Sequence, residues 1–409
     1  MKDSERISRI HDALREHELD ALVVSLPRHV LMLTGYYPVV GTTVAIFTRD
    51  GTVALIAPKD EEQFARESWA DPIQYFEPAS LERILPISDV LTPVLAGVRD
   101  QLGLAHARIA IESGPASEPS SYSEMHLYGA ELWHIANEAF PAATFIRAHD
   151  LLAQLEGIKT PQEIAAIRTA CSVAAAGFDF ARRDLHPGSK EMELAAQTGA
   201  LFASSAASAG VDRQHAFIYC MSGPNSAKAY YAYAHSAARR INHADAVLLH
   251  CNSQLNGFWT DITRSFLMGN ASAKLNDMMR VVLEARDAAL ARIAPGIAAC
   301  EVDRAAREVI EKNGYGSAFK HPTGHGVGFG AISAAALPRL HPKSTDKLET
   351  GMVFNVEPAI YLENIGGVRQ CEMVAVTSAG CDLLTPFQNR SEDLQLPKRR
   401  VAWCQALSS

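Results

Sequence analysis

The chain has 409 residues, of which 48% are hydrophobic and 21% charged, a composition typical of folded globular proteins and not of disordered chains. Its formal net charge of −8 argues against binding to nucleic acid through phosphate contacts. The sequence contains no uninterrupted apolar run long enough to cross a membrane and no signal-peptide pattern. We therefore expect a cytoplasmic protein with neither a nucleic-acid nor a membrane partner.

Seven cysteines are distributed singly along the chain, and no Cys-x-x-Cys pair occurs. An odd number of isolated cysteines matches neither a disulfide framework nor a structural zinc knuckle. We expect most of them to be small buried hydrophobic residues in a reducing compartment, with Cys371 as the candidate exception.

The first 150 or so residues alternate between helical and strand patterns. Apolar residues at helical spacing, such as Ile7, Ile10 and Leu14, predict an amphipathic helix. Asp50-Gly51 separates two short apolar runs, and this dipeptide is typical of a hairpin turn. The patterns predict an α/β domain with a helix over residues 4–18 and strands over 21–26, 44–47, 53–57 and 109–112.

A helix-start signal marks the boundary between two domains. Thr160 can cap a helix, Pro161 suits the first helical position and Glu163 completes a capping box. We expect a long helix from this point and divide the chain into domains of residues 1–155 and 156–409. The second domain is predicted to contain helices ending near 183 and spanning about 190–205, 272–293 and 300–313, and strands within 244–268 and 350–377.

Two apolar runs around Leu255-Asn256-Gly257 predict a hairpin that carries a histidine and a carboxylate. With the loop centred between residues 255 and 256, His250 lies directly opposite Asp261. Opposed residues of an antiparallel pair point to the same face, so the two side chains would converge.

A second predicted hairpin surrounds Asn364. If its loop is centred on Asn364, Glu357 faces Cys371, and if the centre lies half a residue later, Glu357 faces Glu372. Because strand side chains alternate between faces, the two registers turn different side chains inward, and the sequence leaves both open.

Two glycine-containing turns carry further polar residues. His325 lies in Gly324-His325-Gly326-Val327-Gly328, and residues without a side chain allow the close backbone approach that a ligand site requires. The turn Ser222-Gly223-Pro224-Asn225-Ser226 precedes a group of aromatic residues that includes Tyr230, Tyr233 and His235.

Four motifs, in this order, resemble those of the creatinase/aminopeptidase family, also called the pita-bread family. The N-terminal domain, including Leu33-Thr-Gly-Tyr36, is similar to that of the family as well. The resemblance implies an α/β (α+β) protein in which a creatinase-like α/β domain precedes a pita-bread domain, with two α-β-β halves around a curved antiparallel sheet. The motifs are Asp261-Ile-Thr-Arg-Ser-Phe266, the glycine-flanked His325, Gly351-Met352 leading to Glu357-Pro358, and Gly367-Val368-Arg369.

The resemblance also implies an activity. Members of the family cleave Xaa-Pro bonds with two divalent metal ions, usually Mn, Co or Zn, and most are homodimers. We therefore expect a homodimer that acts on a dipeptide or another small molecule. The metal-ligand positions implied by the resemblance are His250, Asp261, His325, Glu357 and Cys371.

The chain departs from the family pattern at two of the metal-ligand positions. His250 stands where the family has its first aspartate, and Cys371 where it has its last glutamate. Glu372 follows directly and could substitute for that glutamate after a shift of one residue. Two auxiliary histidine positions of the family fall at Tyr230, or Tyr233 if the loop is longer, and at Ile332.

These departures reduce the negative charge of the side chains that could bind metal ions. The intact family set offers four carboxylates and one imidazole, whereas this chain retains two carboxylates, plus one further negative charge if Cys371 ionises. A single ion at Asp261, His325 and Glu357 suits this charge better than two ions, and added imidazole and thiolate ligands favour Zn over Mn. The sequence thus predicts one divalent ion or none.

Three functions remain open. The first is a Xaa-Pro peptidase-like hydrolase of C–N bonds without strict proline specificity, in which a metal ion activates water and Glu357 or Glu372 is the base. The second is a metal-independent, creatinase-like hydrolase of a small amidino or cyclic amide compound, with His325 and Glu357 as acid–base groups and Cys371 or a carboxylate as nucleophile. The third is a non-catalytic binding module. On the substrate side we expect Tyr230, Tyr233, His235 and Arg369. Arg369 either binds a substrate carboxylate in bidentate fashion or forms an internal ion pair.

Overall fold

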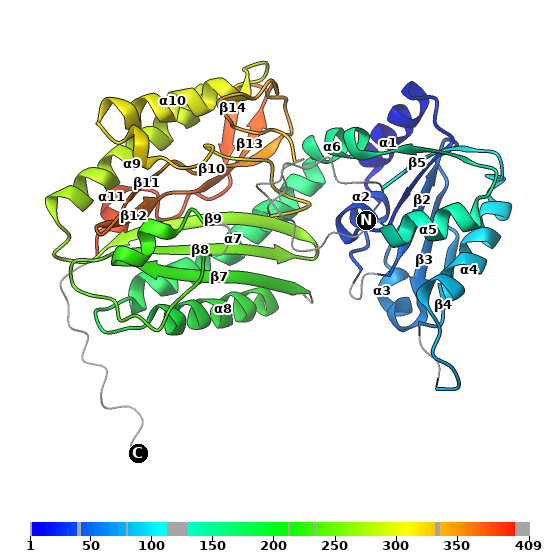
Figure 1. Ribbon diagram of the computed structural model, residues 1–409, viewed down its shortest axis with the longest axis horizontal. Coiled ribbons are helices and arrows are strands. Elements are labelled where there is room, and N and C mark those ends of the chain that lie inside the picture. Colours follow the sequence, from blue (N-terminus) through cyan, green and yellow to red (C-terminus); the bar gives the residue numbers. More distant parts are fainter. Residues whose placement is uncertain are drawn as a thin grey trace. The chain divides into compact units, whose positions relative to one another are not determined.

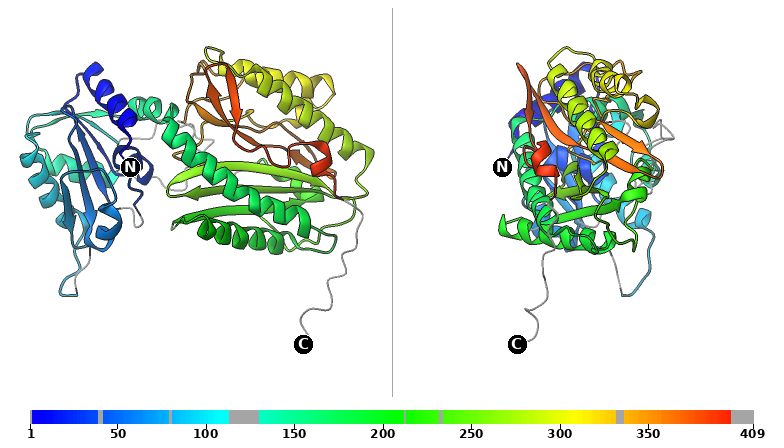
Figure 2. Two further views of the ribbon diagram at one scale, coloured as in Figure 1. Left: turned by 180° about the vertical axis from the view of Figure 1, so that it is seen from behind. Right: turned by 90° about the vertical axis from the view of Figure 1, so that its left-hand side faces the viewer.

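The computed structural model describes residues 2–38, 42–78, 81–112, 130–211, 213–231, 234–331 and 336–396. The chain divides into two compact units, Met1–Gln162 and Glu163–Ser409 (Figures 1 and 2). Tyr233 and Ile332, both considered above as site positions, lie outside the described residues.

A six-stranded mixed sheet forms the N-terminal unit, with the strand order β4-β3-β2-β1-β5-β6. β1, β2 and β3 pair in antiparallel fashion, and β4, β5 and β6 are added by parallel pairing. The strands are Ala21–Val24 (β1), Val44–Thr48 (β2), Val53–Pro58 (β3), Ile73–Phe76 (β4), Arg108–Ile111 (β5) and Thr144–Arg147 (β6). The helices are Ser4–Glu16 (α1), Pro27–Thr34 (α2), Glu62–Ala65 (α3), Ile87–Gln101 (α4), Ala130–Ala139 (α5) and His149–Gly157 (α6).

The predicted α/β pattern of this unit is confirmed. β2 and β3 form the hairpin expected around Asp50-Gly51, where Gly51 has φ +89°, a value that favours glycine. Residues of β1, β2 and β3 are buried throughout, and those on one face pack with apolar residues of α4 and α5 in a single core. The strands are therefore apolar because both faces of the sheet are covered.

A buried charged cluster joins α2, β5 and α6. His29 Nδ1 hydrogen-bonds to Glu112, and His29 Nε2 lies 2.7 Å from Glu156. Arg28 lies 3.2 Å from the same Glu156 carboxylate. Burial by itself favours the neutral imidazole, but the two carboxylates outweigh it and raise the pKa of His29 to about 9.

We expect the stability of the N-terminal unit to depend on pH through His29. Its pKa is about 9 in the folded chain against an ordinary 6.5, so its contribution is complete below about pH 6.5 and is lost as the pH rises through about 9. The free energy of unfolding should fall by about 3 kcal/mol across this interval. Urea denaturation at a series of pH values measures the change.

A matched pair of variants isolates this effect. His29→Gln should abolish the fall in stability, whereas His11→Gln, at a partly exposed position on α1, should retain it. An unchanged pH slope in His29→Gln would contradict the assignment of the titration to this cluster.

The C-terminal unit combines two pairs of long helices and the short helix α11 with antiparallel sheets of two or three strands, ordered β7-β8-β9, β10-β13-β14 and β11-β12. Figure 2 shows α7 and α8 lying across one face of β7-β8-β9. The helices are Pro161–Asp184 (α7), Glu191–Ser208 (α8), Ala273–Arg292 (α9), Ala299–Lys312 (α10) and Ser391–Leu394 (α11). The strands are Gln214–Ser222 (β7), Ala246–Leu255 (β8), Phe258–Leu267 (β9), Val353–Val356 (β10), Ala359–Leu362 (β11), Gly366–Arg369 (β12), Glu372–Thr377 (β13) and Gly380–Leu383 (β14).

α7 is long and apolar enough to cross a membrane by length and composition alone. The core helix of a globular unit passes the same test, and Ile167, Ala170 and Phe178 of α7 are buried within the C-terminal unit. The expectation that no segment spans a membrane stays a prediction.

The β8–β9 hairpin forms around a two-residue turn. Asn256 and Gly257 occupy the turn with φ +48° and +90°, and Leu255 pairs with Phe258. Asn-Gly is favoured in such turns because both central positions need positive φ. The centre of the loop therefore lies between Asn256 and Gly257, one residue later than predicted.

This shift corrects the predicted pairing of the two hairpin ligands. His250 lies opposite Thr263, and Asp261 lies opposite Asn252, so the direct pairing of His250 with Asp261 is wrong. The partner changes by two residues, and a shift of two preserves the face to which a strand side chain points. His250 and Asp261 consequently still share one face of the sheet.

The hairpin around Asn364 adopts the first of the two registers left open by the sequence. Leu362 pairs with Gly366, and Val356 pairs with Glu372. In this register Glu357 and Cys371 are on the same face. Glu372 points to the opposite face.

Candidate metal centre

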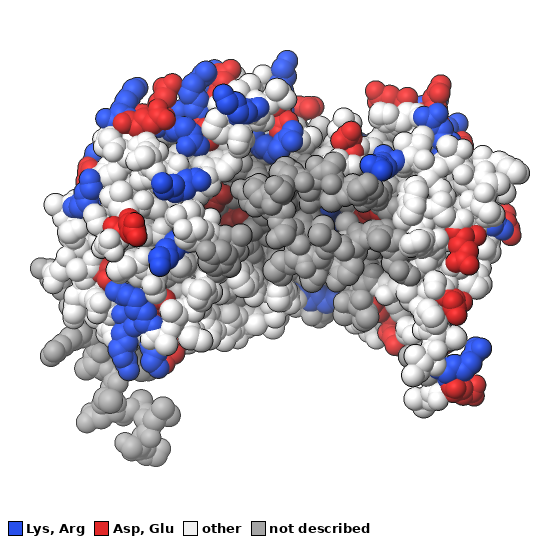
Figure 3. Space-filling model, viewed as in Figure 1, with Lys and Arg blue, Asp and Glu red and all other residues white. Residues whose placement is uncertain are grey.

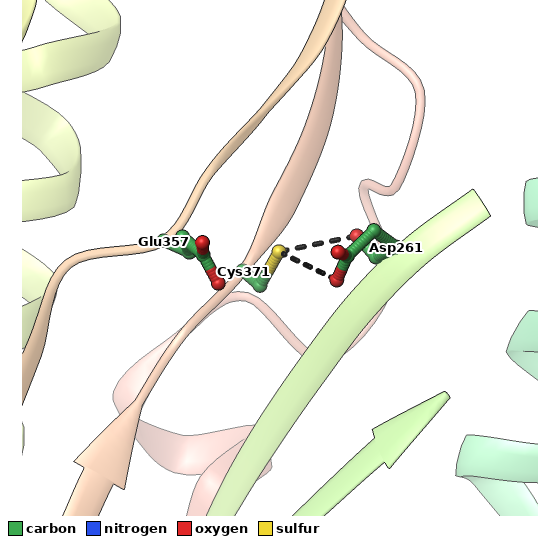
Figure 4. A group of neighbouring side chains, drawn as sticks. All are labelled: Asp261, Glu357 and Cys371. Atoms are coloured by element: carbon green, nitrogen blue, oxygen red, sulfur yellow. Dashed lines mark hydrogen bonds between the residues drawn. The ribbon is translucent and has the colours of Figure 1, made fainter. Parts of the chain in front are cut away.

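Three side chains converge where the short sheets of the C-terminal unit meet. Ligand atoms of Asp261 on β9, Glu357 after β10 and Cys371 before β13 all lie within 4.8 Å of one another, and Figure 4 shows the side chains turned toward a common space. The Cys371 N–H donates to the carbonyl oxygen of Thr263 at 3.1 Å. This backbone bond joins the two hairpins and brings together residues that are far apart in the sequence.

A glycine-lined loop places His325 beside this group. An ideal Cβ at Gly324 would lie 1.9 Å from the carbonyl oxygen of Asn355, so the loop packs against β10 in a way that leaves no room for a side chain. The predicted close backbone approach is confirmed. His325 Nε2 lies 3.5 Å from Asp261 Oδ2 and 4.0 Å from Glu357 Oε1.

Both ring nitrogens of His250 are engaged by other side chains. Nδ1 lies 3.0 Å from Arg369 Nη2 and 2.9 Å from Thr263 Oγ1, and Nε2 lies 2.5 Å from Asn252 Oδ1. Burial lowers the pKa of His250 to about 4, so the imidazole is neutral near pH 7. His250 Nδ1 is 3.8 Å from Asp261 Oδ1, beside the candidate centre, but its hydrogen bonds leave no free nitrogen lone pair for a metal ion.

The guanidinium of Arg369 lies beside the centre. It donates to Thr263 Oγ1 at 3.0 Å and to the Tyr219 hydroxyl at 2.9 Å, and its Nη1 lies 3.8 Å from Glu357 Oε2. The Tyr219 ring stacks on His250 with 4.6 Å between ring centroids. Arg369 is buried and does not lose its proton, so it is a fixed positive charge next to the carboxylates.

Glu372 lies on the opposite side of its strand. Its carboxylate is 2.7 Å from Arg264 Nη2 and 3.5 Å from Arg286 Nη1, and it accepts a hydrogen bond from Thr385 at 2.6 Å. The side chain is fully buried in this ion pair. The expectation that Glu372 serves as a base or replacement ligand is therefore corrected. Glu372 forms an ion pair with two arginines on the side of the strand that faces away from the centre.

Burial and neighbouring charges set the protonation of the cluster. Burial raises the pKa of Glu357 to about 7, and it raises the pKa of the Cys371 thiol well above its ordinary value. Burial disfavours a charged His325, but Asp261 and Glu357 outweigh it and raise the pKa of His325 to about 9. Without a bound cation, Cys371 is thus a neutral thiol, which is a poor nucleophile.

Aromatic residues line one side of the centre. The Tyr361 hydroxyl is 3.0 Å from His321 Nε2 and 3.5 Å from Arg369 Nη1. The ring of Tyr230 lies 5.3 Å from that of Tyr361, which places this predicted residue near the site. His235 is exposed and instead lines a surface groove between α8 and β7.

The sequence interpretation missed three residues that contact predicted site residues, Tyr219, Asn252 and Tyr361, and also His321, which contacts Tyr361. A signal existed for Asn252, because it lies two residues after His250 on the same strand and so on the same face. Tyr219 and Tyr361 could not be found in this way, since their positions depend on how separate hairpins meet.

The donor set fits one divalent ion. Ligand atoms about 2.0–2.3 Å from a shared ion lie no more than about 4.6 Å apart. Asp261, Glu357 and Cys371 are close to this spacing, and His325 Nε2 faces two of them. Carboxylate oxygen, imidazole nitrogen and thiolate sulfur are together typical zinc ligands.

Comparisons with known proteins give the family. Residues 165–378 match metallopeptidase family M24, and residues 6–155 match the creatinase/prolidase N-terminal domain. The chain is 28% identical over 382 residues to the Xaa-Pro dipeptidase of Pyrococcus horikoshii, an alignment that covers 93% of this chain and 97% of that one.

Solved structures of a prolidase and a dipeptidase have the same fold as this chain. The prolidase from Pyrococcus horikoshii matches with a TM-score of 0.74 and 26% identity over 93% of this chain and 98% of the other. A dipeptidase from the same organism matches with a TM-score of 0.77 and 25% identity over 96% and 99% of the two chains.

The chain therefore belongs to metallopeptidase family M24, with a creatinase/prolidase N-terminal domain followed by a pita-bread domain. It is a hydrolase of peptide-type C–N bonds, and the family uses divalent metal. The hypothesis of a non-catalytic binding module is set aside on this ground.

We expect the two buried glutamates to differ sharply in their effect on stability. Glu372→Ala leaves two buried arginines without their carboxylate and should lower the free energy of unfolding by about 3–5 kcal/mol. Glu357→Ala should cost much less, because burial already disfavours the charged form of that carboxylate. Urea denaturation of both variants measures this difference, and equal losses would contradict the placement of the two residues.

Proposed function

We propose that this protein is a dipeptidase-like hydrolase that cleaves a C–N bond with one divalent ion rather than two. The observation that carries the proposal is the state of His250. Three ligand positions of the family, Asp261, His325 and Glu357, are retained and lie together, whereas His250 is hydrogen-bonded through both ring nitrogens. A second ion would thus lack the ligand that position 250 supplies in the family pattern.

The proposed ion would be held by Asp261, His325, Glu357 and Cys371, with zinc favoured over manganese by the sulfur ligand. When bound, such an ion polarises a substrate carbonyl and lowers the pKa of a water molecule. Binding it requires His325 and Cys371 to release their protons, because only the unprotonated forms are ligands.

The remaining chemistry is assigned to residues around the ion. Glu357 is also the proposed general base, because its carboxylate has two oxygens and binding the ion needs only one of them. Glu357 Oε2 faces Arg369, and Oε1 faces His325. Arg369 is proposed to hold the substrate carboxylate, with Tyr230 as part of the pocket wall.

A metal-independent reaction is the second candidate, and one observation favours it. His325 and Glu357 lie 4.0 Å apart with pKa values raised to about 9 and about 7, which suits an acid–base pair. The raised pKa of Cys371 argues against its use as a nucleophile in such a reaction. Sensitivity to chelators separates the two candidates.

Metal content tests the proposed single ion. Protein purified without chelators should contain about one equivalent of zinc per chain by elemental analysis, and the His250→Asp/Cys371→Glu double variant should bind a second equivalent. Two equivalents in the unmodified protein would contradict the single-ion proposal, and none would favour the metal-independent reaction.

Cobalt substitution gives a readout that does not depend on activity. The cobalt-loaded protein should show a thiolate-to-cobalt absorption band that disappears in Cys371→Ser. Cys251→Ser is the matched control, because Cys251 is also buried, on β8, but points to the opposite face from His250. A band that survives in Cys371→Ser would rule out sulfur ligation by this residue.

Hydrolysis of dipeptides tests the reaction. We expect cleavage of Ala-Pro and Ala-Ala with kcat/KM values within about tenfold of each other, which is a discrimination of less than about 1.4 kcal/mol. Glu357→Gln should lower kcat by at least about a hundredfold. Strong exclusive cleavage of Xaa-Pro dipeptides would show that proline specificity survives without the auxiliary histidines.

The remaining expectations concern partners and location. A homodimer and a cytoplasmic location remain proposals that rest on the resemblance to the family. No nucleic-acid partner is expected, and on the face shown in Figure 3 lysines and arginines lie among aspartates and glutamates.

A further inference from the structure

The side-chain amide of Asn252 is an unpaired donor beside the candidate metal centre. Asn252 is only 5% exposed, and its Nδ2 has no hydrogen-bond partner among the described residues. It lies directly opposite Asp261 in the β8–β9 pair, so both side chains are on the same face. A buried amide without a partner costs about 1–3 kcal/mol, which calls for a compensating role.

The orientation of this amide follows from Arg369. A guanidinium only donates hydrogen bonds, so His250 Nδ1, 3.0 Å from Arg369 Nη2, must be an acceptor without a proton. A neutral imidazole of this kind carries its proton on Nε2. Nε2–H then donates to Asn252 Oδ1 at 2.5 Å, which turns Oδ1 toward His250 and leaves Nδ2 pointing elsewhere.

The chain of hydrogen bonds also strengthens the free donor. Arg369 is positively charged, and hydrogen bonds in series polarise one another in a buried setting. The charge of Arg369 therefore polarises His250, which in turn polarises the amide of Asn252. The outcome is a donor at Nδ2 that is stronger than an isolated amide.

The carboxylate nearest to Asn252 in the strand pair does not take up this donor. The Asp261 carboxylate is directed to other groups, with Oδ2 3.5 Å from His325 and Oδ1 3.8 Å from Cys371 Sγ. On the other side Asn252 pairs with Phe217 of β7, which is 45% exposed. Asn252 thus lies between the candidate centre and an accessible aromatic side chain on the same sheet face.

We propose that Asn252 is a substrate-positioning residue whose Nδ2 donates a hydrogen bond to an oxygen of the dipeptide substrate. The acceptor is either the carbonyl oxygen of the bond to be cleaved or the terminal carboxylate, which share the same acceptor chemistry. The inference rests on the proposed function for its substrate class.

Steady-state kinetics with Ala-Pro and Ala-Ala tests the proposal in the full chain. Asn252→Ala should lower kcat/KM by about tenfold or more, the loss expected for one buried donor to a polar substrate group. Asn252→Asp should be more harmful, because it still accepts from His250 but presents a carboxylate oxygen to the substrate oxygen. Ser253→Ala is the matched control, since Ser253 is buried on the same strand and hydrogen-bonds to Thr260 on the opposite face.

The kinetic constants identify which oxygen is bound. A lower kcat at unchanged KM assigns the donor to the carbonyl oxygen, where negative charge develops during the reaction. A higher KM at unchanged kcat assigns it to the carboxylate, which is charged throughout. Either result supports the proposal.

Two results would overturn it. If Asn252→Ala changes the melting temperature but neither kcat nor KM, the residue is structural. If nitrogen NMR of His250 shows the proton on Nδ1 instead of Nε2, the amide of Asn252 is reversed and no donor is free. Failure of the unmodified protein to bind or cleave any dipeptide is a different result, because it removes the proposed substrate class and this inference with it, whatever the variants do.

Discussion

A buried guanidinium organises the centre of the C-terminal unit. Arg369 cannot lose its charge, so every group around it must offer an acceptor or a negative charge. Tyr219, Thr263 and His250 accept its hydrogen bonds, and Glu357 lies within 4.0 Å of it as an ion-pair partner. The tautomer of His250, and through it the orientation of the Asn252 amide, follows from the hydrogen bond that this buried guanidinium donates.

A second buried arginine system lies on the other side of the same strands. Arg264 and Arg286 share the carboxylate of Glu372, and Arg264 also donates to the carbonyl oxygen of Cys371 at 2.7 Å. Two arginines of the family motifs therefore have separate roles. Arg264 stabilises the junction of the hairpins from behind, and Arg369 lies on the side of the candidate metal centre.

The altered residues of the centre form a consistent set. An aspartate at position 250 would add negative charge next to Arg369, whereas the neutral His250 leaves that charge to act on its neighbours. A cysteine at position 371 is uncharged until a cation lowers its pKa, because burial opposes the thiolate. Both residues carry less negative charge than the carboxylates of the family pattern, which supports the proposed single cation beside the permanent charge of Arg369.

The sequence alone was sufficient to predict the family and most of the helices and strands. Helical periodicity, the Asp50-Gly51 turn and the start signal at Pro161 are local, and local patterns depend on neighbouring residues only. The glycines around His325 also predicted a close backbone approach, which Gly324 makes against Asn355. The ordered motifs also predicted ligand positions, of which Asp261, Glu357 and Cys371 lie together in the structure.

Only the tertiary structure decided which way several side chains point. Successive side chains of a strand point to opposite faces. An uncertainty of half a residue in the loop centre therefore left open whether Cys371 or Glu372 points to the same face as Glu357. The same uncertainty misplaced the partner of His250, until the positive φ angles of Asn256 and Gly257 set the turn. The engagement of His250 by Arg369, 119 residues away in sequence, depends on the meeting of two hairpins, and no local pattern records such a contact.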